Sequence, residues 1–104
     1  MTAGRQVSGR GRQGRVWISE PGNLYATALL IDPAPIERIG TLPFVAATAL
    51  HAALADLPGM QHHELRLKWP NDLLVNRSKI SGILLESDRL HDGGIAVACG
   101  FGVN

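Results

Sequence analysis

The sequence has one cysteine, no long apolar run and no apolar segment near its N-terminus. The single cysteine, Cys99, excludes an internal disulfide framework and fits a reducing compartment. A membrane span needs about 18 consecutive apolar residues, and a secretory signal needs an apolar h-region behind its first residues. We therefore expect a cytoplasmic protein with no membrane partner. The 104 residues are enough for one small domain, and 45% of them are apolar, which is typical of a globular chain.

Positive charge is concentrated at one end of the chain. The net charge is only +1, but residues 1–15 hold four of the ten basic residues and no acid, so six bases and all nine acids lie in the remainder. The four are Arg5, Arg10, Arg12 and Arg15. A cationic, glycine-rich head before a mildly acidic body predicts an anionic partner for the head.

The pattern after residue 15 predicts five strands and one helix. The strands are expected at 23–31, 64–69, 73–75, 79–87 and 95–101, each bounded by turn residues. The helix is expected from Thr41, as N-cap, to Leu57, before Pro58-Gly59. Its apolar face is expected to contain Leu42, Val45, Ala46, Ala49, Leu50, Ala53, Leu54 and Leu57. This indicates the α+β class: a mixed, mostly antiparallel sheet with the helix packed on one face.

The segment GRGRQGR at residues 9–15 is the first candidate site. Glycine lets backbone N–H groups approach an anion, and guanidinium groups bind phosphate or carboxylate with two hydrogen bonds. The segment matches neither a P-loop nor a dinucleotide fingerprint. The alternative is a disordered Arg/Gly tail that binds RNA through its phosphates.

Two further candidates lie in the second half. In KWPND at 68–72, Pro70 ends a strand and displays Asn71 and Asp72, which could hold hydrated Mg²⁺ or a nucleotide; the alternative is a simple turn. Lys79 begins an apolar strand beside Ser81-Gly82, where it could face a cavity and neutralise developing negative charge, or could be an ordinary solvated lysine. The histidines have no metal-ligand spacing with Cys99 or a carboxylate.

In this order the motifs resemble the catalytic domain of biotin–protein ligases, within the biotin/lipoate protein ligase superfamily. The matching stretches are Gln6 with GRGRQGRVW, GNLYAT at 22–27, KWPNDLLV at 68–75, KISGILLES at 79–87 and GFGVN at 100–104. The resemblance implies a partial class II aminoacyl-tRNA-synthetase-like fold and an enzyme, a biotin–[biotin carboxyl-carrier protein] ligase. It implies that biotin and ATP, with Mg²⁺, form biotinyl-5′-AMP, and that biotin then passes to a lysine of a carboxyl carrier domain, as in acetyl-CoA carboxylase.

The resemblance also implies roles for individual residues. Lys79 and Arg12 are expected to be catalytic. Biotin binding is expected from Gln6, Arg10, Gly11, Arg12 and Lys79. ATP or adenylate binding is expected from Arg10, Arg12, Arg15, Trp17, Asn23, Lys68, Asn71, Asp72 and Asn104. Asp72 is also the expected contact to Mg²⁺.

We expect residues 1–104 to form part of a catalytic domain, with 1–15 as the ligand-binding loop and 16–104 as the core. The family's Ser-Thr-Asn segment, helix-turn-helix domain and C-terminal SH3-like domain have no counterpart among these residues, so DNA binding is not expected. A catalytically incomplete ligase and an Arg/Gly-type RNA-binding protein are the alternatives. Whether the chain forms a homodimer is left open by its sequence.

Overall fold

The computed structural model describes all 104 residues as one six-stranded sheet with a helix on it. The spatial order of the strands is β1-β2-β6-β5-β4-β3, and every neighbouring pair is antiparallel. The strands are β1 (Thr2–Ala3), β2 (Leu24–Ile31), β3 (Leu65–Lys68), β4 (Asp72–Val75), β5 (Ser78–Arg89) and β6 (Ile95–Val103). The helix α1 spans Leu42–Ala55, and 3₁₀ turns lie at Arg12–Gly14, Ile36–Thr41 and Met60–His62. The predicted fold class is confirmed.

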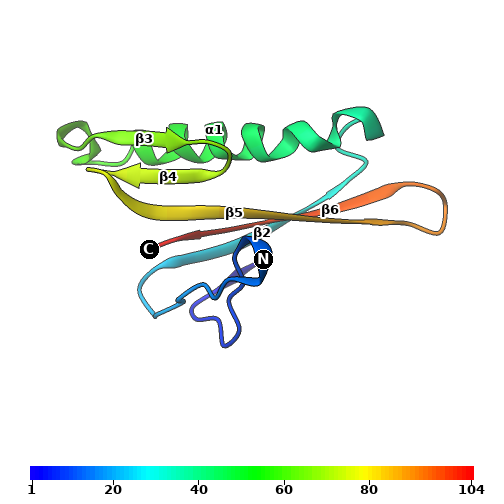
Figure 1. Ribbon diagram of the computed structural model, residues 1–104, viewed down its shortest axis with the longest axis horizontal. Coiled ribbons are helices and arrows are strands. Elements are labelled where there is room, and N and C mark those ends of the chain that lie inside the picture. Colours follow the sequence, from blue (N-terminus) through cyan, green and yellow to red (C-terminus); the bar gives the residue numbers. More distant parts are fainter.

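The sheet separates two layers that differ in structure. Figure 1 shows α1 along one side of the sheet, next to β3 and β4, and the N-terminal segment on the other side. The helix packs mainly on β3, β4 and β5, and it also reaches Cys99 of β6. We call the two sides the helix face and the ligand face.

Side-chain alternation along the strands assigns residues to the two faces. On the helix face, Ala47 of α1 packs with Ile83 and Cys99, and Leu85 and Phe101 surround this cluster. Leu73 and Val97 are fully buried. The intervening residues of β5 and β6 point to the ligand face; they are Gly82, Leu84, Glu86, Ala98, Gly100 and Gly102.

Two details of the helix prediction are wrong. Four of the expected inward residues, Val45, Ala49, Ala53 and Leu57, are exposed, whereas Ala47 is buried. The helix is apolar around most of its circumference, so the three- and four-residue spacing does not define a single buried face. Thr41 does not cap the helix with its side chain either. The 3₁₀ turn Ile36–Thr41 runs directly into α1, and the Oγ1 atom of Thr41 donates to the carbonyl of Arg38.

Together the 3₁₀ turn and α1 form one segment, Ile36–Ala55, which contains an 18-residue stretch with a mean hydropathy of 1.3. By length and composition this segment could cross a membrane. In the structure Ala46, Ala47 and Leu50 pack against the sheet, and 6% of the apolar stretch is buried.

The first residues, expected to be loop, add a short strand. Thr2 and Ala3 pair with Ala26 and Tyr25, and the amide of Thr27 donates to the carbonyl of Met1. The physical reason is that an unpaired edge of β2 offers hydrogen bonds to any extended segment beside it.

Candidate ligand-binding site

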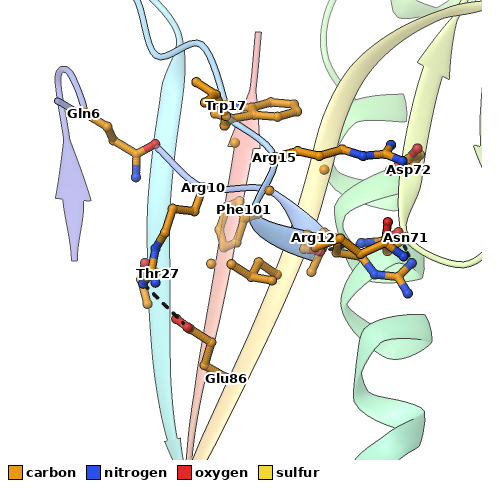
Figure 2. Close-up of a pocket in the computed structure, with 18 of the residues that line it drawn as sticks. Gln6, Arg10, Arg12, Arg15, Trp17, Thr27, Asn71, Asp72, Glu86 and Phe101 are labelled. Atoms are coloured by element: carbon orange, nitrogen blue, oxygen red, sulfur yellow. Dashed lines mark hydrogen bonds and ion pairs between the residues drawn. The ribbon is translucent and has the colours of Figure 1, made fainter. Parts of the chain in front are cut away.

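A cavity of about 630 Å³ lies on the ligand face. Its walls come from the N-terminal loop, the segment Pro70–Asp72, and strands β2, β5 and β6. Figure 2 shows the labelled arginines and Trp17 of the loop around this space, opposite side chains of the sheet. The volume lies within the range of small-molecule sites, about 300–1,000 Å³.

The floor of the cavity is made of glycine, and Trp17 lies directly on it. A Cβ atom at Gly102 would stand 2.6 Å from Nε1 of Trp17, and one at Gly82 would stand 3.4 Å from Cζ3. Any side chain at position 102 would therefore displace the indole. Trp17 Nε1 is buried without a hydrogen-bond partner, so this end of the site has an unused donor.

The Arg/Gly loop forms a compact turn over the sheet. Arg10 pairs with Val16, the amide of Gly11 donates to the carbonyl of Arg15, and the amide of Trp17 donates to the carbonyl of Gly9. At the tip, Gln13 and Gly14 have φ of 58° and 71°, the left-handed region that glycine adopts at little cost. This turn directs Arg10, Arg12 and Arg15 to the lining of one cavity.

Each of three cations contacts a polar partner on the sheet side. Lys79 Nζ lies 3.0 Å from Asp72 Oδ1 and 5.5 Å from the centre of the Trp17 ring. Arg12 Nη1 donates to Asn71 Oδ1 at 3.3 Å. Asn71 is buried, and its side-chain nitrogen Nδ2 donates to the backbone carbonyl of Ile83. Asn71 therefore joins the loop to β5.

The third contact is weaker. Arg10 Nη2 lies 3.6 Å from Glu86 Oε1, and the two side chains are 69% and 59% exposed (Figure 2). Exposed pairs of this kind contribute about 0–1 kcal/mol. An incoming anion could therefore take Arg10 from Glu86 at little cost.

The charges around the cavity favour an anionic ligand. The lining contains three arginines and Lys79 but only two acids, Asp72 and Glu86. Guanidinium and ammonium groups that converge on a partly enclosed space attract carboxylate and phosphate.

The structure brings together nine of the twelve predicted site residues. Those lining the cavity are Gln6, Arg10, Gly11, Arg12, Arg15, Trp17, Asn71, Asp72 and Lys79. Lys68, Asn23 and Asn104 do not line it. Lys68 ends the edge strand β3 and is exposed; Asn23 donates to the carbonyl of Glu20, and Asn104 to that of Ile18, so both amides support loops at the end of the sheet.

Sequence reasoning missed several lining residues. Thr27, Glu86 and Phe101 line the cavity, and Gly82 and Gly102 form its floor. The alternation of positions 82, 84 and 86 along the predicted strand was a usable signal for Glu86. The approach of Trp17 to Gly102, separated by 85 positions, left no local signal.

The site has few groups suited to a metal. No three His, Cys, Asp or Glu side chains gather anywhere in the chain, and Asp72 is the one carboxylate beside Lys79. One carboxylate fits Mg²⁺ that is held mainly by the phosphates of a nucleotide, since Mg²⁺ is often bound in that way.

Comparison with known proteins identifies the class. The Biotin/lipoate A/B protein ligase family matches residues 1–104, and the chain belongs to this family. Among relatives, it is 45% identical to the biotin–[acetyl-CoA-carboxylase] ligase of Paracoccus denitrificans over 98% of the chain and 42% of the relative. It is 36% identical to the bifunctional ligase/repressor BirA of Bacillus subtilis over 100% of the chain and 31% of the relative.

Solved structures show the same likeness. The chain matches the biotin protein ligase from Aquifex aeolicus in complex with biotin and ATP, with a TM-score of 0.75, 38% identity, and coverage of 99% of this chain and 40% of that one. It matches the Leishmania major enzyme in complex with biotinyl-5-AMP, with a TM-score of 0.79, 30% identity, and coverage of 99% and 45%. The chain thus spans less than half the length of these relatives.

Proposed function

We propose that this chain carries the biotin-activating centre of a biotin–protein ligase. The observation that carries the proposal is the convergence of Arg10, Arg12, Arg15 and Lys79 on one cavity over a glycine floor. Family membership and the ligands of the similar structures support biotin and ATP as the molecules bound. The compact turn of the Arg/Gly loop over the sheet supports this function over a disordered RNA-binding tail.

In the proposed first step a carboxylate oxygen of biotin attacks the α-phosphorus of ATP. A new O–P bond forms, the bond to pyrophosphate breaks, and biotinyl-5′-AMP results. Negative charge accumulates around the α-phosphorus, and fixed cations stabilise it. The contacts of the Lys79 ammonium group with Asp72 and the Trp17 ring, at the cavity, support this role for Lys79.

In the second step the amine of an acceptor lysine attacks the acyl carbon and AMP leaves. The relative in Paracoccus denitrificans carries acetyl-CoA carboxylase in its name, which supports a carboxyl carrier domain as the acceptor. Until then the mixed anhydride must be shielded from water. The Arg/Gly loop can provide this cover, since Arg12 joins it to Asn71 across the cavity.

Mg²⁺ would enter with ATP. Asp72, which lines the cavity, would contact the metal, and the metal would neutralise phosphate charge. Asp72 also holds Lys79, so this carboxylate would keep two cations near the same phosphates.

Isothermal titration calorimetry tests the proposal directly. Biotin alone, MgATP alone and both together are titrated into the chain, and biotinylation of a purified carrier domain is measured beside them. Binding of biotin, with Arg12→Gly weakening retention of biotinyl-AMP, is the expected result. Arg38→Gly is the matched control, because Arg38 does not line the cavity.

The other outcomes separate the alternatives. Binding without carrier biotinylation would mean that the chain holds ligand but is catalytically incomplete. No heat with biotin, together with RNA binding that weakens steeply with salt, would contradict the proposal and favour the RNA-binding alternative.

A further inference from the structure

The strand β5 contains one irregularity, and it lies beside Lys79. Leu73 of β4 pairs with Ser81, but the next residue, Leu74, pairs with Lys79 rather than with Ile80. Ile80 is thus an extra residue without a partner on β4, which defines a β-bulge. The pairing of β5 with β6 begins at Ser81, so the bulge affects only the ladder with β4.

The bulge changes the side of the sheet on which Lys79 lies. Ser81 and Ile83 are buried on the helix face, and in a regular strand the residue two positions before Ser81 would share that face. Lys79 instead lines the cavity with Gly82, Leu84 and Glu86. A one-residue change in register moves side chains to the opposite face, and here it moves the functional lysine.

Other contacts fit this arrangement. The carbonyl of Ile80 accepts a hydrogen bond from the amide of Asn104 at 2.7 Å, so the bulged residue is held from the β6 side. Gly82 leaves room for the lysine: a Cβ atom there would stand 3.7 Å from both Cε and Nζ of Lys79. The side chain of Lys79 can therefore pass over Gly82 to reach Asp72.

We propose that the β-bulge at Ile80 sets the side of the sheet on which Lys79 lies: because Ile80 is left out of the pairing with β4, Lys79 pairs with Leu74 and points into the cavity. The inference rests on the proposed function for the role of Lys79. It leads to an unusual expectation. Removing Ile80 should leave Lys79 in the cavity, because Lys79 still pairs with Leu74 and directly precedes Ser81 in a now regular strand.

The opposite change should move the lysine away. One valine inserted between Leu73 and Leu74 would pair with Ile80 and so remove the bulge. In the regular strand that results, Lys79 should point to the helix face. In that background, exchanging the two residues (Lys79→Ile with Ile80→Lys) places a lysine in the cavity again. If this exchange restores the lysine contact, the insertion acted by changing the direction of the lysine and not by disrupting the structure in general.

Two measurements follow the lysine in the full chain. The first is an NMR nuclear Overhauser contact between the side chain at position 79 or 80 and the ring of Trp17, which needs no ligand. The second is formation of biotinyl-AMP. We expect the deletion of Ile80 to keep the contact and to keep adenylation within about tenfold, while the insertion loses the contact and about 10²–10³-fold in rate. The exchange should restore both.

Loss of the Trp17 contact on deletion of Ile80, or its persistence in the insertion variant, would overturn the proposal. If the insertion variant does not fold, cross-strand contacts in the unmodified chain decide: a Leu74–Lys79 contact supports the bulge, and a Leu74–Ile80 contact refutes it. A chain that shows the Trp17 contact yet binds no biotin would contradict the proposed function and leave the positioning of Lys79 by the bulge intact.

Discussion

The same strands form both faces of the sheet, but large apolar side chains cover one face and glycines leave the other open. On the helix face, branched and bulky side chains such as Ile83, Leu73 and Val97 fill the space and are at most 3% exposed. On the ligand face, glycines at 82, 100 and 102 remove side chains and leave a cavity that cations from a loop surround. One face thus contributes stability and the other contributes space and charge. Substitutions on the two faces should therefore separate folding from ligand binding.

The largest expected effect comes from the ligand face. Lys79→Ala should lower the rate of biotinyl-AMP formation by about two to three orders of magnitude, as expected for a lost electrostatic donor at the reacting centre. Its unfolding midpoint should change little, since Lys79 lies at a cavity rather than in the core. Lys68→Ala is the matched control, because Lys68 lies outside the cavity. An unchanged rate for Lys79→Ala in pyrophosphate-release assays would refute the assignment.

The helix face should show the reverse behaviour. Leu73 is 0% exposed, and Leu73→Ala should destabilise the chain by about 2–5 kcal/mol through lost burial and a cavity. Urea denaturation measures this, and biotin affinity below the transition should stay near that of the unmodified chain. Leu29→Ala, at a side chain that is 69% exposed, should cost far less. Equal costs for the two would mean that the helix face is not the stabilising side.

The glycine floor offers a sharper comparison within the ligand face. Gly102→Ala should force Trp17 from its place. An overpacking cost of about 1–3 kcal/mol, if it falls on the ligand-bound form, corresponds to binding that is about 5- to 150-fold weaker. Gly100→Ala is the control. The nearest atoms to a Cβ there stand at 3.6 Å and 3.7 Å, and alanine in a strand is favoured over glycine by about 0.5–1 kcal/mol. Equal binding by both variants, measured by calorimetry, would show that the Trp17 contact is not essential.

The smallest effect concerns Cys99 in the core. Burial raises the pKa of the Cys99 thiol, so the folded state favours the protonated form. Its contribution to stability is present below the thiol's ordinary pKa of about 8.5 and is lost as pH rises through the raised value. The stability gap between the unmodified chain and Cys99→Ala should therefore narrow from pH 7 to pH 10 in urea titrations. A gap that stays constant would mean that the thiol titrates alike in both states.

Much of this protein could be predicted from local sequence because its signals are local. Turn residues bounded the strands, alternation marked the sheet, and the motifs at 9–15, 68–72 and 79–87 contained seven of the nine predicted residues that line the cavity. The inward side of α1 could not be predicted, since an apolar helix packs on whichever side fits the sheet. The strand Thr2–Ala3 depended on an open edge of β2 that no local pattern reveals.

The sequence by itself therefore determined much of the composition of the site: which cations, and which amide and carboxylate. The tertiary structure decided their arrangement. Strand pairing placed Gly102 beneath Trp17, and an extra residue at Ile80 turned Lys79 from the buried face to the cavity. The physical reason is that a side chain's direction follows from its hydrogen-bonded partner across the sheet, and that partner is set by register between strands rather than by neighbouring residues.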